Sequence, residues 1–151
     1  MAGEDLGVVV DCIRANQLVG TLEGIDMSQI DKRLVGKVGD GDFVGGLRRE
    51  AVRFLGIAAA GEGHFAPSKI VDAYWHELVL NTPLYARVAE AMGVFVHHNP
   101  TENPERESFQ RTLEAYTRVF GESVPAAYWA KGDAADCASF CSGGACTTCT
   151  N

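Results

Sequence analysis

The sequence predicts an all-α protein, a small bundle of about four or five helices followed by a flexible C-terminal tail. Apolar residues recur every three or four positions through four segments between residues 43 and 120. Each segment is bounded by capping residues, proline or glycine. Large apolar residues almost disappear after residue 130, so we expect a helical domain over 1–130 and a tail over 131–151.

The N-terminal segment leaves two interpretations open. Gly7–Val10 is weakly typical of a strand, but Val8–Val19 could equally form a first helix. A short helix is expected within Leu22–Leu34, with Asp26 or Ser28 as its cap.

The clearest helix begins at Phe43, after a loop marked by the glycines of 36–41, and ends at Gly61. Its apolar positions are 43, 47, 51, 54 and 58. The charged residues fall mostly on the opposite face, which we expect to be wet: Arg48, Arg49, Glu50 and Arg53.

Two further helices have recognisable starts. Ser68 is the expected cap of the first, and Thr82 followed by Pro83 opens the second, which Gly93 ends. We expect the helix that begins at Ser68 to bury one set of apolar residues: Ile70, Val71, Tyr74, Trp75, Leu78 and Val79.

The last helix opens at Asn103-Pro104 and ends at Gly121. Its apolar stripe comprises Phe109, Leu113, Tyr116 and Val119 or Phe120. Short connections between four such segments favour a bundle.

Composition excludes several classes of protein. The chain has 151 residues and a net charge of −7, which disfavours a nucleic-acid partner because phosphate binding needs a local surplus of lysine and arginine. No segment approaches the roughly 20 apolar residues of a membrane span. Glu4 and Asp5 precede the short apolar run Leu6–Val10, which does not resemble an export signal. We therefore expect a soluble, cytoplasmic protein.

Four of the five cysteines crowd into the tail, with the spacing Cys-x₃-Cys-x₄-Cys-x₂-Cys. They are Cys137, Cys141, Cys146 and Cys149. Four thiolates could surround one Zn²⁺ or Cu⁺. The mixture of Cys, Ser, Thr and Gly equally resembles the core of a post-translationally modified peptide precursor. An inert low-complexity tail is the third interpretation.

A second cluster lies in the helical domain. Asp72 and His76 are four residues apart and share a helix face, and His97 and His98 follow the next helix. One carboxylate and imidazoles could bind a divalent metal such as zinc or iron. The same residues could instead form a structural hydrogen-bond network, or act in catalysis without a metal. No nucleophile elbow, phosphate loop or dinucleotide fingerprint accompanies them.

One block of the sequence resembles the glycine-rich domain-containing protein-like family, a domain of unknown function. The matching residues are Pro67-Ser68, Val71-Asp72, Trp75-His76, Leu80, Thr82, Tyr85 and Gly93-Val94-Phe95-Val96-His97-His98-Asn99-Pro100. The resemblance extends over roughly residues 25–129 and implies a helical fold. Members of that family often carry a cysteine three residues after the tyrosine, where this chain has Val88. The resemblance therefore does not imply a thiol-dependent role for the domain. Bacterial members often end in Cys/Gly-rich tails, which this chain also resembles.

These features predict a non-catalytic carrier or docking domain with a protein partner, either a modifying enzyme or another docking protein. The domain would present the cysteine-rich tail for metal binding or modification. The alternative is a metal-dependent enzyme with its Asp/His site on the helical domain.

Overall fold

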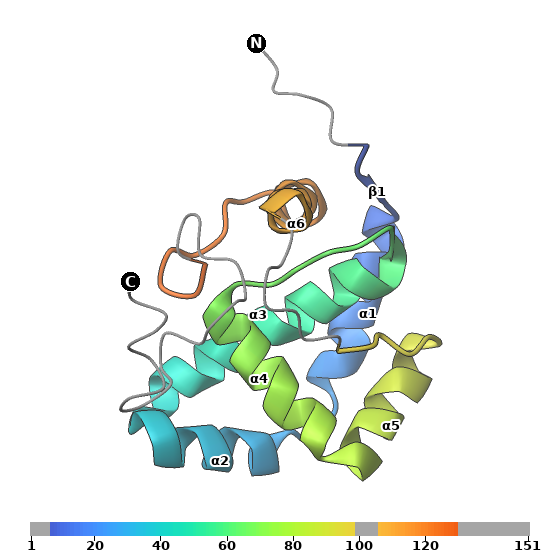
Figure 1. Cartoon of the computed structure of the whole chain (residues 1–151). Coiled ribbons are helices and arrows are strands. Elements are labelled where there is room, and N and C mark those ends of the chain that lie inside the picture. The colour runs from blue at the N-terminus through green and yellow to red at the C-terminus, as the bar shows by residue number, and fades with distance from the viewer. Residues whose placement is uncertain (1–6, 99–105, 130–151) are drawn as a thin grey trace.

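The computed structural model describes residues 7–98 and 106–129 and confirms the all-α fold within them (Figure 1). Six helices account for most of these residues: α1 (Cys12–Glu23), α2 (Ser28–Val38), α3 (Gly41–Ala60), α4 (Lys69–Leu80), α5 (Thr82–Met92) and α6 (Arg106–Phe120). Two strands of two residues each, β1 (Val9–Val10) and β2 (Gly61–Glu62), pair antiparallel.

Helix α3 is the centre of the fold and contacts α1, α2, α4 and α6 (Figure 1). Its side chains Phe54, Leu55 and Ile57 are fully buried. Helix α1 approaches α3 closely at Gly56, where an added Cβ would lie 2.9 Å from Val19 Cγ2. A glycine at this position therefore lets two core helices pack directly against each other.

The N-terminal segment combines the two interpretations that the sequence left open. Val9 and Val10 form β1, and α1 begins at Cys12 with Asp11 as its N-cap. The Asp11 side chain accepts a hydrogen bond from the Arg14 amide at 3.0 Å.

The connection between α2 and α3 differs from the sequence prediction. Gly36 lies inside α2, and the chain turns only at Gly39, which has a φ of 79° and ends the helix. Asp40 caps α3, so this helix begins at Gly41 and not at Phe43. The cause is local, because an aspartate cap fixes the start of a helix before its apolar stripe begins.

The predicted helix boundaries around α4 and α5 are mostly correct. Ser68 caps α4, and the left-handed glycines Gly93 and Gly121 follow α5 and α6. Thr82 is not the cap of α5, because the side chain of Asn81 accepts the amide hydrogen bond instead. The predicted start of the last helix at Asn103 lies outside the described residues.

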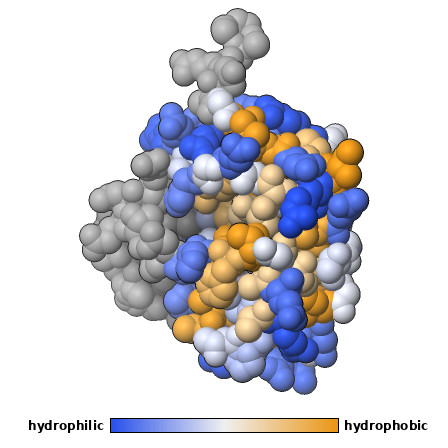
Figure 2. Space-filling model, turned by 90° about the vertical axis from the view of Figure 1, so that its right-hand side faces the viewer, coloured by the Kyte–Doolittle hydropathy of each residue, from blue (hydrophilic) through white to orange (hydrophobic). Residues whose placement is uncertain are grey.

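Some apolar side chains reach the surface on the side of the molecule where α5 lies. Figure 2 shows this face, with apolar residues gathered among polar ones. Leu80, Val94 and Phe95 are about half exposed. Val94 and Phe95 belong to the segment that leads from α5 to the two predicted site histidines. Within the residues described, no helix combines the length and apolar character that crossing a membrane requires.

Candidate functional site

The residues of the predicted metal cluster come from α4 and from the segment after α5. Tyr85 on α5 donates a hydrogen bond to the Val96 carbonyl and accepts one from Trp75 Nε1 at 3.2 Å. Burial raises the pKa of Tyr85, so its hydroxyl stays a donor at neutral pH. These two bonds hold the segment after α5 against α4.

Asp72 and His98 are brought together by this arrangement. The Nε2 atom of His98 lies 3.1 Å from Oδ1 of Asp72, and the side chains are 7% and 32% exposed. The rings of His98 and Trp75 also pack nearly perpendicular to each other, with a centroid distance of 4.7 Å. The imidazole is therefore held by one carboxylate and one indole ring.

The other two histidines lie differently. His76 is exposed, and its ring centroid is 5.3 Å from that of His98. His97 is also exposed and packs on Phe95 at 4.7 Å. Three of the four predicted residues, Asp72, His76 and His98, thus gather at one place, and His97 contacts a different ring.

In residues 7–98 and 106–129, no three His, Cys, Asp or Glu side chains are grouped as a bound metal ion would require. Asp72 and His98 bond to each other, as the structural interpretation expects. Zinc or iron binding by Asp72, His76, His97 and His98 stays a prediction that would need a third ligand to turn toward the pair.

The four tail thiols, Cys137, Cys141, Cys146 and Cys149, lie outside the described residues. Cys12 is the described cysteine, and it is partly buried at the start of α1. Its Sγ lies 3.8 Å from the Arg118 carbonyl. Cys12 therefore belongs to the contact between α1 and α6.

A histidine and serine outside the predicted cluster also meet. Nδ1 of His64 lies 3.1 Å from Oγ of Ser108. A serine nucleophile must be reached by its substrate, and Ser108 is fully buried at 0% exposure. We assign this pair to the packing of α6 against the segment before α4.

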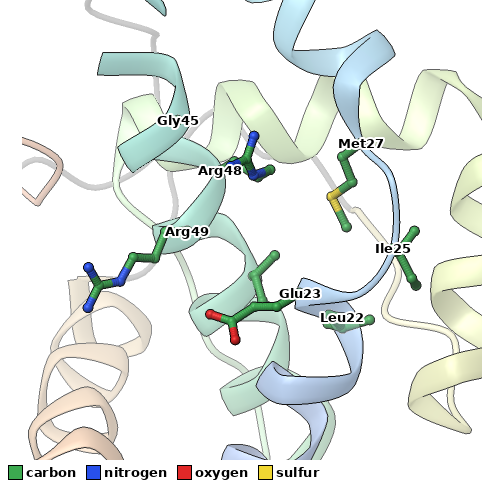
Figure 3. Close-up of a pocket in the computed structure, with 8 residues that line it drawn as sticks. Leu22, Glu23, Ile25, Met27, Gly45, Arg48 and Arg49 are labelled. Atoms are coloured by element: carbon green, nitrogen blue, oxygen red, sulfur yellow. The ribbon is translucent and has the colours of Figure 1, made fainter. Parts of the chain in front are cut away.

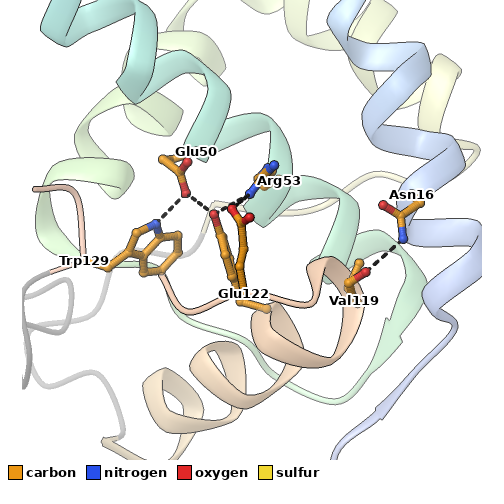
Figure 4. Close-up of polar contacts among 7 residues, drawn as sticks. Asn16, Glu50, Arg53, Val119, Glu122 and Trp129 are labelled. Carbon is orange, nitrogen blue, oxygen red and sulfur yellow. Dashed lines mark hydrogen bonds and ion pairs between the residues drawn. The ribbon is translucent and has the colours of Figure 1, made fainter. Parts of the chain in front are cut away.

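A polar cluster that the sequence did not predict joins α3 to α6 and to the segment that follows α6 (Figure 4). Glu50 is 3% exposed, although the sequence placed it on the wet face of its helix. Its Oε1 accepts hydrogen bonds from Tyr116 Oη at 2.7 Å and from Trp129 Nε1 at 2.9 Å. Arg53 donates to Tyr116 Oη at 2.7 Å and to Glu122 at 3.0 Å.

This cluster compensates the burial of the carboxylate. Burial raises the pKa of Tyr116, and the hydrogen bond and charge of Glu50 raise it further. The phenol therefore remains protonated and donates to Glu50. The sequence did contain a signal, because position 50 lies three residues after Leu47 and four before Phe54, on the apolar face.

Tyr128 fixes the segment after α6 at a second point. Its hydroxyl donates to the Phe43 carbonyl at 2.9 Å, and Ser68 Oγ donates to the Tyr128 carbonyl at 2.6 Å. A Cβ on Gly46 would lie 2.1 Å from the Tyr128 hydroxyl oxygen, so glycine is required for this approach. We call Tyr128 and Trp129, with the contacts that hold them, the C-terminal anchor.

Comparison with known proteins decides the family. The model of the UCP032817-like family, a domain of unknown function, matches residues 46–121. The chain belongs to the UCP032817-like family. The match includes most of α3 and all of α4, α5 and α6, and therefore the Asp72–His98 pair and Glu50.

The match is narrower than the resemblance over 25–129 that the sequence predicted. It confirms a helical domain of unknown function, and it extends neither to α1 and α2 nor to the tail. Searches of curated proteins and of solved structures found no significant match.

Proposed function

We propose that this UCP032817-like domain is a non-catalytic carrier that docks a protein partner and presents Cys137, Cys141, Cys146 and Cys149. The tail thiols would be sites of metal capture or enzymatic modification. The resemblance to glycine-rich domain-containing proteins, whose bacterial members often end in Cys/Gly-rich tails, supports the same proposal.

The observation that carries the proposal is the C-terminal anchor. Trp129 is 2% exposed and is bonded to Glu50, two residues before the expected tail begins. A fixed point at residue 129 sets where residues 137–149 can reach, since each residue extends the chain by at most about 3.3–3.6 Å. The domain thereby gives a docked partner a defined starting point for finding the thiols.

The chemistry of the tail supports two uses of the thiols. Four thiolates satisfy the tetrahedral coordination of Zn²⁺, and soft thiolates also suit Cu⁺. Alternatively, cysteines interleaved with serine and threonine offer nucleophilic thiols beside hydroxyl groups, which a modifying enzyme could join or alter. Both uses depend on the tail cysteines and not on Cys12.

The test compares the chain purified from its native host with two variants. One variant carries serine at all four tail cysteines, and the matched control is Cys12→Ser. Metal content and the number of thiols that react in denaturant are measured for each protein. We expect fewer than the five thiols of the sequence to react, or a bound metal that the four-serine variant lacks and the control keeps. Five reactive thiols with no tail-dependent metal would refute the carrier.

A metal-dependent enzyme is the second candidate, favoured by the approach of His76 to the bonded pair of Asp72 and His98. It predicts a bound metal that survives removal of residues 131–151 and is lost in Asp72→Asn. A chain without residues 131–151 that binds neither zinc nor iron would reject this candidate.

A further inference from the structure

Residues 121–129 lead from the end of α6 to the C-terminal anchor, and we call them the strap. The connecting part, 121–127, is exposed except for Val124 and Pro125, which are partly buried. The hydrogen bonds of Tyr128 and Trp129 then fasten the strap to the domain at its far end. The hold on the strap is therefore concentrated in the anchor.

The backbone of the strap is bonded within itself. The amides of Tyr128 and Trp129 donate to the Pro125 carbonyl at 3.1 and 3.0 Å, and among the described residues no strap amide donates to α3 or α4. Glu122 of the strap pairs with Arg53 at 3.0 Å, but Glu122 is 55% exposed, and an ion pair with such a partner adds little stability. The strap can therefore move without breaking the backbone bonds of a neighbouring helix.

The groups that receive the anchor each have a second partner in the domain. Oε1 of Glu50 also accepts from Tyr116, and Oγ of Ser68 also accepts from the Val71 amide at 3.2 Å as the cap of α4. The Phe43 carbonyl belongs to α3, in which a carbonyl accepts from the amide four residues further along. Departure of the strap therefore leaves none of these three acceptors buried without a partner.

The rest of the core packs without the strap. Val52 follows Glu50 by two positions and so lies on the other side of α3. There Val52, Leu22 and Met27 are almost fully buried around a pocket at the end of α1 (Figure 3). Helix α6, from which the strap departs, contacts α1, α3 and β1. These contacts remain when the strap leaves its seat.

Gly121 provides a pivot at the start of the strap. It follows the last residue of α6 and has a φ of 72°. A Cβ added there would meet no atom within 4 Å, so the residue is not enclosed. Because glycine adopts both signs of φ at little cost, the chain can change direction at this point without disturbing α6.

We propose that the strap is a latch that opens at Gly121 and releases Tyr128 and Trp129 while the helices stay folded. The closed latch fixes the start of the tail at residue 129. Opening moves the fixed point back to Phe120 and adds about 30 Å to the reach of the tail, since residues 121–129 become extended chain. The use of this reach rests on the carrier function proposed above, in which a docked partner that binds the open state better shifts the chain toward it.

Hydrogen exchange of the two indole N–H groups tests the latch. Trp129 and Trp75 are 2% and 5% exposed, and their Nε1 atoms donate to the buried residues Glu50 and Tyr85. NMR of the full chain in D₂O follows both groups. We expect Trp129 to exchange at least about tenfold faster than Trp75, at a rate that low urea concentrations hardly change, because local opening exposes little surface. Equal rates, or a slower Trp129, would overturn the proposal.

Two tyrosine variants separate the latch from global unfolding. Tyr128→Phe removes the bond to the Phe43 carbonyl and should speed the exchange of Trp129 about fivefold. Tyr74→Phe removes the bond to Asp31, away from the anchor, and weakens the domain equally whether the latch is closed or open. It should therefore speed the exchange of Trp75 and leave that of Trp129 unchanged.

An exchange rate of Trp129 that rises with that of Trp75 in Tyr74→Phe, or that does not rise in Tyr128→Phe, would also overturn the latch. None of these rates depends on the tail thiols, so serine at all four tail cysteines should leave them unchanged. Failure of the latch thus leaves the carrier proposal standing, and failure of the carrier leaves the latch.

Discussion

Glu50 is a carboxylate enclosed in the core, and two buried donors depend on it. Its replacement leaves Tyr116 Oη and Trp129 Nε1 without their acceptor. We predict that Glu50→Ala lowers the free energy of unfolding by about 2–4 kcal/mol, since each unsatisfied buried donor costs about 1–3 kcal/mol. Urea unfolding followed by circular dichroism measures this loss.

Glu50→Gln serves as the matched control. Its amide oxygen still accepts a hydrogen bond, so we expect it to lose clearly less stability than Glu50→Ala. Equal losses in the two variants would show that the charge of Glu50, and not its role as acceptor, stabilises the anchor.

The ion pairs of Glu77 lead us to predict that the stability of the fold depends on pH. Its side chain is 7% exposed and lies 2.9 Å from Lys37 Nζ and 3.1 Å from Arg33 Nε. Burial opposes ionisation, but the hydrogen bond and charge of Lys37, together with Arg33, outweigh it and lower the pKa of Glu77 below its usual 4.5. The stabilisation is therefore present above about pH 4.5 and is lost as the pH falls through the lowered pKa.

Glu77→Gln removes the titrating group and provides the comparison. Because both cationic partners are more than half exposed, the difference in unfolding free energy at neutral pH should be only about 1 kcal/mol. Urea unfolding at a series of pH values should show this difference shrinking below pH 4.5. A difference that stays constant across the series contradicts the ion-pair assignment.

At the scale of the elements, the contact of α1 with α3 depends on one glycine. A methyl group at Gly56 would lie 2.9 Å from Val19 Cγ2 and 3.1 Å from the Ala15 carbonyl oxygen. We predict that Gly56→Ala destabilises the fold by about 1–3 kcal/mol through overpacking. Thermal unfolding gives the measurement.

Gly20→Ala is the control for this contact. Gly20 lies within α1 with nothing within 4 Å of an added Cβ, so alanine should stabilise the protein by about 0.5–1 kcal/mol. If Gly56→Ala is also stabilising, the helices are not in direct contact there.

The sequence predicts these elements well where local chemistry decides them. The side chain of Ser68 caps the start of α4. Gly93 and Gly121 follow the last residues of α5 and α6 and adopt the positive φ that glycine allows. The prediction of Thr82 as the cap was wrong because Asn81, one residue earlier, is a better capping residue and takes the hydrogen bond. The prediction of a loop at Gly36 was wrong because a helix tolerates a single glycine when its neighbours pack well.

At the scale of the whole molecule, the folded domain is expected to end at the C-terminal anchor. We predict that a chain ending at Ala130 is as stable as the full chain in urea unfolding, within about 0.5 kcal/mol, because Phe140 is the only large apolar side chain in the tail. A chain ending at Ala127 loses Tyr128 and Trp129 and should be less stable by about 3–5 kcal/mol.

These two truncations differ by only three residues and so control for each other. Equal stability of both chains would show that the anchor does not hold the domain together. A large loss in the chain ending at Ala130 would place the domain boundary later than residue 130.

The candidate sites were predictable only in part, for reasons of long-range packing. The helix spacing placed Asp72 and His76 on one face, but the partner of Asp72 is His98, in a segment that Tyr85 holds by its hydrogen bond to the Val96 carbonyl. The anchor residue Trp129 lies 79 positions from Glu50, and no local pattern shows that contact.

The carrier proposal is tested most directly by the intact mass of the chain purified from its native host, under denaturing and non-denaturing conditions. The account predicts a covalent mass change within residues 137–149, or a metal mass that disappears on denaturation and is absent when the tail is removed. An unmodified chain that holds no metal, or one that keeps its metal without the tail, would contradict it.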